Sequence, residues 1–213
     1  MLGVAMNPRR PLGQRPFALL RDLVPQRWAA EHCEMCGAAL APAHQHLIEP
    51  ASRRLLCCCD PCAILFSGRQ SARYRRVPRL IQSLPVFRLT DAQWEELHLP
   101  INLAFFFRSS PAGRVVAVYP SPAGATESLL PLEAWHALEE ENPLLREFEA
   151  DVEALLVNRV GPARDYYRVP IDECYKLVGL IRTNWRGLSG GSEVWEVIGR
   201  FFSSLKERSN PDA

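Results

Sequence analysis

The segment between Cys33 and Cys62 gathers the residue types that bind transition metals. It reads CEMCGAALAPAHQHLIEPASRRLLCCCDPC and holds six of the chain's seven cysteines and two of its five histidines. Two Cys-x-x-Cys pairs, Cys33 with Cys36 and Cys59 with Cys62, are separated by 22 residues. Each pair can offer two thiolates to one ion, and four thiolates make a tetrahedral site suited to zinc or iron. We therefore predict that these four cysteines bind one metal ion.

The same segment contains other soft ligands whose roles the spacing leaves open. If the chain is an extended strand here, Cys57 and Cys59 face one side and Cys58 the other, so a Cys57-x-Cys59 pair is an alternative to the second Cys-x-x-Cys pair. His44 and His46 share a strand face at period two. They could complete a mixed site or form a second one. In the alternative interpretation, they are surface or structurally hydrogen-bonded histidines.

Zinc is the metal that we expect, with iron as the alternative. A closed four-thiolate zinc site has no open coordination position, which argues against hydrolytic chemistry and for a structural role. A rubredoxin-like iron site uses the same paired cysteines, and Cys36-Gly37 fits it. Ala63 fits it less well, because a rubredoxin usually has glycine at that place. Either metal would supply folding energy to a module too small to build a large core.

The elements that must position these ligands are short. HQHLIEPASRRLLC predicts two strands around a turn at EPAS, and AILFSG predicts a short helix that ends at glycine. We expect residues 1–30 to form a flexible arm with a short helix, because the first half of this stretch is rich in proline, glycine and arginine. Residues 31–77 would then form the Cys-rich metal-binding module, a zinc ribbon or a rubredoxin-like fold, and residues 78–213 an α+β body.

In the body, apolar runs predict several strands. PVFRLT, residues 85–90, is expected as a strand, and INLAFFFRSS and GRVVAVYP as two strands of a hairpin joined at a Pro-Gly turn. VEALLVNRV, residues 152–160, indicates a further strand or a helical turn. YPSPAGATES, residues 119–128, is expected as a loop between strands, since it lacks the Gly-Lys-Ser/Thr of a phosphate-binding loop.

Helix signals occupy the rest of the body. Thr90 and Gln93 form a capping-box pattern, and Pro131 stands at a typical first helical position. Apolar residues at 3–4 spacing predict a helix from residue 171, and Ser192 could cap a second one. The fold class is therefore α+β, with a small, mostly antiparallel sheet packed on a C-terminal helical hairpin. Cys174 lies on the apolar face of the first of these helices and is expected as a core thiol, and no catalytic constellation is predicted.

Charge is unevenly distributed along the chain. Residues 1–80 hold 12 arginines against 5 acidic residues, and the remainder is acidic overall. A basic surface could meet an acidic protein or nucleic acid, or could simply be solvated. The sequence shows neither a secretory signal nor an apolar run of the roughly 18 residues that a membrane span needs, so a cytoplasmic protein is expected. The predicted partner surface is either the metal-binding module itself or the arginine-rich region that comprises Arg69, Arg73, Arg75, Arg76 and Arg79.

Several longer motifs carry a resemblance. CEMCGAAL, HQHL, RRLLCCCDPC, NLAFFF, YPSPAGATESLL, DVEALLV, PIDECYKLVGLIR and WRGLSGG together resemble a bacterial family of unknown function whose members lie near nickel-iron hydrogenase genes. The resemblance implies cysteines at positions 33, 36, 57, 59 and 62, with Cys58 a departure of this sequence. It also implies an accessory or assembly role for hydrogenases, through contacts with hydrogenase subunits or other maturation proteins.

Together these features predict a metal-binding, non-catalytic accessory protein. The alternatives are a rubredoxin-like iron electron carrier and a zinc-ribbon protein that binds nucleic acid.

Overall fold

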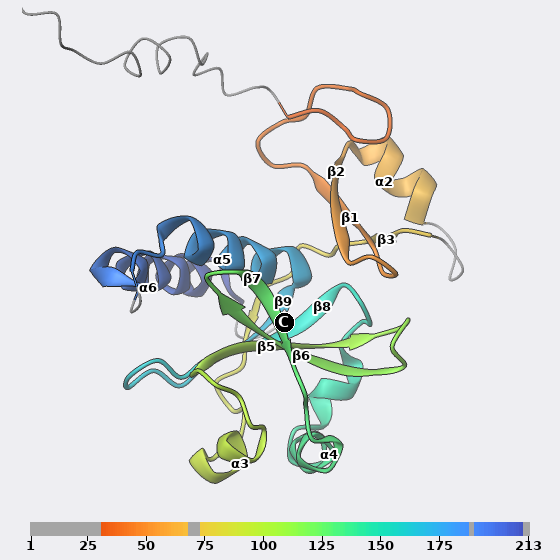
Figure 1. Ribbon diagram of the computed structural model, residues 1–213. Coiled ribbons are helices and arrows are strands. Elements are labelled where there is room, and N and C mark those ends of the chain that lie inside the picture. Colours follow the sequence, from red (N-terminus) through yellow and green to blue (C-terminus); the bar gives the residue numbers. More distant parts are fainter. Residues whose placement is uncertain (1–30, 68–72, 188–189, 211–213) are drawn as a thin grey trace, which may run out of the picture. The chain divides into compact units, whose positions relative to one another are not determined.

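A computed structural model describes residues 31–67, 73–187 and 190–210 of the chain (Figure 1). The arm and short helix predicted for residues 1–30 lie outside the described residues, as does Arg69 of the predicted partner surface. The described parts are α+β, with two antiparallel sheets, as the sequence predicts. None of the described helices combines the length and the apolar character that a membrane span needs.

The smaller sheet belongs to the cysteine-rich segment. Its strands are β1 (Gln45–Glu49), β2 (Arg54–Cys58) and β3 (Arg75–Arg76), in the order β2-β1-β3. The turn between β1 and β2 spans residues 50–53, as expected, and β2 leads directly into helix α2 (Asp60–Ser67). The predicted strand pair and short helix are thus confirmed.

The larger sheet has six strands in the order β4-β9-β8-β5-β6-β7, and every neighbouring pair is antiparallel. The expected hairpin is β5–β6, and residues 152–160 contain strand β8 rather than a helical turn. The prediction of a loop at 119–128 is wrong, because residues 124–128 form the edge strand β7. The strands are β4 (Gln82–Ser83), β5 (Leu103–Ser109), β6 (Arg114–Ser121), β7 (Gly124–Ser128), β8 (Glu153–Asn158) and β9 (Asp165–Pro170).

Helices cover both faces of this sheet (Figure 1). The predicted C-terminal pair, α5 (Ile171–Asn184) and α6 (Gly191–Arg208), packs on one face. The other face, whose cover the sequence did not predict, is packed by α3 (Asp91–Glu96), α4 (Leu132–Glu141) and the 3-10 helix Pro143–Glu147.

The sheet therefore separates two apolar cores, and strand alternation decides which side chain enters which. In β5, Phe105 and Phe107 pack with α5 and α6, whereas Ala104 and Phe106 pack with α3 and α4. Because both faces of the large sheet are buried, the sequences of its central strands are continuous apolar runs.

Two predicted helix starts have different outcomes. The capping box of α3 is confirmed, since Thr90 Oγ1 accepts from the Gln93 N–H at 3.2 Å and Gln93 Oε1 accepts from the Thr90 N–H at 2.9 Å. The prediction that Ser192 caps the last helix is wrong. That helix begins at Gly191, one residue before Ser192, and is preceded by Gly190, which has a φ of 86°. A Cβ at Gly190 would lie 2.8 Å from a Val194 methyl group, so this turn requires glycine.

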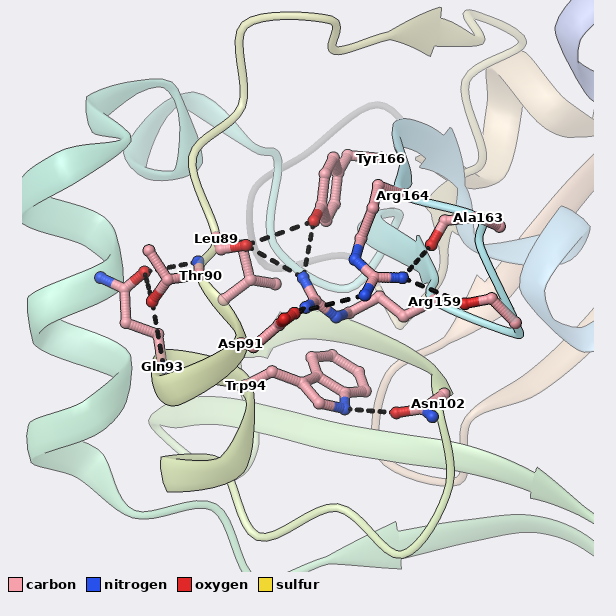
Figure 2. Close-up of polar contacts among 11 residues, drawn as sticks. Leu89, Thr90, Asp91, Gln93, Trp94, Asn102, Arg159, Ala163, Arg164 and Tyr166 are labelled. Atoms are coloured by element: carbon pink, nitrogen blue, oxygen red, sulfur yellow. Dashed lines mark hydrogen bonds and ion pairs between the residues drawn. The ribbon is translucent and has the colours of Figure 1, made fainter.

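The strand predicted at residues 85–90 is also wrong, because this segment is irregular. Several of its backbone groups bond to side chains instead of to a neighbouring strand. The Arg88 N–H donates to Asn142 Oδ1 at 2.8 Å, and Asn142 Nδ2 donates back to the Arg88 carbonyl at 2.8 Å. The Leu89 carbonyl accepts from Arg159 Nη1 at 2.9 Å (Figure 2). These contacts satisfy the backbone without a β-ladder.

Arg159 is the centre of the polar cluster in Figure 2. Although only 4% exposed, it donates to Tyr166 Oη at 2.9 Å, forms an ion pair with Asp91 and lies over the Trp94 ring. A buried guanidinium is costly unless its donors are used. Here they are used within the protein, so we assign Arg159 a structural role in fixing the start of α3.

Candidate metal centre

The first cysteine pair lies in a tight turn. Gly37 donates from its N–H to the Cys33 carbonyl at 2.7 Å and has a φ of 78°, a conformation that glycine adopts without strain. The Cys33 N–H donates to the Ala38 carbonyl at 2.8 Å, which closes the turn. This local geometry turns Cys33 and Cys36 toward a common point, as their spacing predicts.

Glu34 fastens this turn to strand β2. Its N–H donates to the Cys57 carbonyl at 2.9 Å, and its Oε1 accepts from the Cys57 N–H at 2.9 Å. Its second carboxylate oxygen pairs with Arg54 at 2.6 Å. The sequence analysis missed this residue, because an acidic side chain within a Cys-x-x-Cys pair carries no signal of a contact 23 residues away.

The second cysteine pair lies at the start of a helix. Cys59 follows the last residue of β2, and its carbonyl accepts from the Ala63 N–H at 2.9 Å in the first turn of α2. Cys62 is buried in that same turn. The module thus consists of a turn, a three-stranded sheet and a helix, and its classification as a zinc ribbon stays a prediction.

The two pairs meet, so that Cys33, Cys36, Cys59 and Cys62 could hold a metal ion. Their four sulfur atoms lie within 4.8 Å of one another, and the Cys36 and Cys59 sulfurs are 3.7 Å apart. A tetrahedron with Zn–S bonds of about 2.3 Å has sulfurs about 3.8 Å apart. Cys33 and Cys62 are buried, whereas Cys36 is exposed, so one edge of the cluster reaches the surface.

Cys33, Cys62 and Cys36 differ in how their surroundings change the pKa of each thiol. Burial opposes ionisation of Cys33, but backbone N–H groups, first that of Cys59, outweigh it and lower its pKa to about 6. Burial and then the neighbouring sulfurs raise the pKa of Cys62. For Cys36, the Ala38 N–H lowers the pKa, yet the adjacent sulfurs prevail and raise it. Thiolates this close together repel one another, and a cation bound among them would relieve that repulsion.

The other two cysteines of the CCC run point elsewhere. Cys58 is fully buried, its thiol donates to the Gln45 carbonyl at 3.5 Å, and burial raises its pKa to about 11. Cys57 projects from the opposite face of β2. The predicted face-sharing of Cys57 and Cys59 fails, because the strand ends at Cys58 and Cys59 already belongs to the turn into α2.

Cys57 instead groups with both histidines. The ligand atoms of His44, His46 and Cys57 lie within 4.8 Å of one another. Burial, and then the carboxylates of Glu31 and Glu34, raise the pKa of Cys57. The three residues therefore do not complete the four-cysteine cluster but form a second group beside it.

Most of the predicted arginine-rich partner surface is engaged within the chain. Arg73 and Arg76 bond to side chains of β1, and Arg75 pairs with two acidic residues that precede β8. Arg79 is exposed and has no ion pair among the described residues, whereas Arg69 lies outside them. These contacts reduce the positive charge that this surface can offer, and its role in partner binding stays a prediction.

Cys174 is the remaining cysteine. It is fully buried in the core between the large sheet and α5, and burial raises its pKa well above the usual range. It is a packed core thiol, as the helical spacing predicts.

Comparison with known proteins gives one result. No curated protein and no solved structure is significantly similar to the chain. The model of a family of unknown function, DUF5947, matches residues 32–209, which include both cysteine pairs and all the described strands and helices. The chain therefore belongs to the DUF5947 family.

Proposed function

We propose that this chain is a non-catalytic accessory protein whose front module is stabilised by a structural zinc ion held by Cys33, Cys36, Cys59 and Cys62. The observation that carries the proposal is the convergence of four thiols, from a turn and from a helix start, within 4.8 Å. A closed set of four thiolates suits scaffolding better than catalysis, because no coordination position is left for a substrate.

The composition of the module's core supports this role. Its buried residues are few, and three of the six are the cysteines Cys33, Cys58 and Cys62. Apolar burial on this scale is small, whereas zinc binding by a structural site contributes on the order of 10 kcal/mol. The metal would therefore provide much of the stability that holds the hairpin and α2 together.

Helix α2 offers a surface for a protein partner. Ile64, Leu65 and Phe66 follow the second cysteine pair after one intervening residue and are 64%, 75% and 41% exposed. Three consecutive exposed apolar side chains are typical of protein-binding surfaces rather than of a solvated helix. The nature of the partner, a nickel-iron hydrogenase subunit or another maturation protein, is proposed from the sequence resemblance and not from the geometry.

An iron-thiolate electron carrier is the second candidate. The exposure of Cys36 favours it, since a ligand sulfur at the surface shortens the path for an electron to a partner. The two candidates share their ligands and differ in the metal, so metal identity separates them.

Metal content and colour test the proposal. We expect the full chain, purified without chelator, to hold zinc and to be colourless, and the Cys36→Ser and Cys59→Ser variants to lose that ion. Cys174→Ala is the control, because this cysteine lies in the body core, and it should keep the metal. Iron with visible charge-transfer bands would instead establish the electron carrier, and serine variants that hold as many metal ions per chain as the unaltered protein would refute the four-cysteine site.

Co-purification tests the partner. In cells that produce the hydrogenase, the tagged chain should retain hydrogenase subunits, and Leu65→Glu should abolish this. Leu129→Glu is the matched control, since Leu129 is 90% exposed but lies outside the module, after β7. Absence of hydrogenase subunits with the unaltered chain would refute the partner.

A further inference from the structure

We propose that His44, His46 and Cys57 form a second transition-metal site, separate from the four-cysteine cluster. This inference goes beyond the proposed function and does not depend on it, since the two sites share no ligand. The chemical class of the ion is zinc-like, a cation that accepts both imidazole and thiolate ligands.

The hairpin positions the three ligands. His46 and Cys57 are directly opposite partners in the β1–β2 pairing, so their side chains project from the same face. His44 precedes His46 by two residues, and the two rings lie edge to face with centroids 4.8 Å apart. Side chains from both strands thus converge, and their ligand atoms all lie within 4.8 Å.

Each histidine is already held through one ring nitrogen. His46 Nδ1 lies 2.7 Å from Asp172 Oδ2, in the first turn of α5, and His44 Nδ1 lies 2.9 Å from the Ala41 carbonyl. Both partners are acceptors, so the tautomer of a neutral ring that satisfies them carries its proton on Nδ1 and has a lone pair on Nε2. Metal-binding histidines are oriented in this way, by a carboxylate or a carbonyl on the second nitrogen.

Structural hydrogen bonding alone does not account for this arrangement. The side chain of His44 is only 8% exposed, yet its Nε2 is buried without a hydrogen-bond partner among the described residues. A buried nitrogen without a partner has lost its hydrogen bond to water and gained none in the protein, which is unfavourable. A metal ion shared with His46 and Cys57 would satisfy this atom.

Charge at the site also fits a dication. Two neutral imidazoles and one thiolate leave a net charge of +1 on a divalent ion. Two carboxylates lie next to the ligands, because Asp172 contacts His46 and Glu31 Oε2 lies 3.4 Å from His44 Nδ1. These acidic groups would compensate the remaining charge without coordinating the ion.

Three protein ligands distinguish this site from the closed four-cysteine cluster. Zinc sites with three ligands keep a fourth position for water or another small ligand. The ion at this second site would therefore be the more exchangeable of the two, and the one open to an external ligand.

Zinc stoichiometry of the full chain tests the inference. After equilibration with zinc and removal of excess metal, we expect two zinc ions per unaltered chain and one in each of the His46→Ala and Cys57→Ala variants. Cys58→Ala is the matched control, since it removes the adjacent thiol that faces the other side of β2, and it should keep two. Far-UV circular dichroism should be unchanged in all three variants.

Cobalt substitution adds a spectroscopic measurement. Two cobalt ions should bind, and His46→Ala should remove only the weaker sulfur charge-transfer band that one thiolate produces. Asp172→Asn should keep the site but weaken its zinc affinity about 10- to 100-fold, because the orienting carboxylate is lost.

The outcomes for the two sites are distinguishable. A stoichiometry that His46→Ala and Cys57→Ala both leave unchanged would overturn the second site, whatever the result for Cys36→Ser. Loss of one ion in these two variants, with no loss in Cys36→Ser, would establish the second site and refute the four-cysteine centre.

Discussion

The cysteine module and the α+β body differ in what holds each of them together. In the module, the buried cluster around Leu47 and Leu56 has six members, half of them cysteines. In the body, the large sheet separates two extensive apolar cores that contain phenylalanines, tryptophans and many branched aliphatic side chains. The body thus has large apolar cores of its own, whereas the small core of the module is what leads us to propose that a bound metal stabilises it.

The module and the body pack against each other. On the hairpin face that carries His46 and Cys57, Ile48 and Leu55 pack into the body core with α5 and α6. The opposite face, with Leu47 and Cys58, packs on α2 and the cysteine cluster. One hairpin therefore belongs to both regions, and each of its faces has a different source of stability.

Metal removal should produce the largest effect. With a strong chelator we expect amide-hydrogen protection to collapse in β1, β2 and α2, because a structural zinc ion contributes on the order of 10 kcal/mol. Strands β5 and β8 should remain protected, since their cores contain no metal ligand. Hydrogen-exchange mass spectrometry of the full chain measures both regions at once. Equal loss of protection in β5 and β8 would break the comparison, since the body would then depend on the metal as well.

A substitution in the core of the body should destabilise the body and leave the metal content unchanged. Leu156→Ala, in the centre of the large sheet, removes a fully buried side chain and should lower the free energy of unfolding of the body by about 2–5 kcal/mol. Metal content of the folded protein should not change. Val86→Ala is the control, because that side chain is largely exposed, and it should cost less than about 0.5 kcal/mol in urea denaturation. Loss of metal from folded Leu156→Ala would show that the two regions are not separately stabilised.

How well the sequence predicts each region depends on how far apart in the chain the contacting residues lie. The cysteine pairs, the β1–β2 hairpin and the apolar faces of α5 and α6 all depend on local spacing, and each was predicted. Strand β7 was missed, because GATES is polar, lies at the sheet edge and shows no apolar alternation. The irregular segment at 85–90 was predicted as a strand, because its apolar residues fit one and the side chains that bind its backbone come from Asn142 and Arg159.

The candidate sites show the same division. The four-cysteine cluster could be predicted, since two Cys-x-x-Cys pairs are typical of a metal site. For the second group, the spacing indicated only that His44 and His46 share a face. Its orienting carboxylate, Asp172, is 126 residues from His46, and an acidic residue in a first helical turn is already explained by the helix dipole. No feature of the sequence indicates that Asp172 and His46 are in contact.

The smallest expected effect concerns an ion pair between the two regions. Arg75 in β3 donates to Asp151 at 3.1 Å and to Glu149 at 3.0 Å, and Asp151 is buried while also accepting from the Ser110 N–H at 2.8 Å. A double-mutant cycle with Arg75→Gln and Asp151→Asn should give a coupling free energy of about 1 kcal/mol, since one partner is buried and the other half-exposed. Arg79→Gln, the control, should change unfolding by less than about 0.5 kcal/mol. Zero coupling would mean that this ion pair does not help to attach the module to the body, and that Arg75 remains available to a partner.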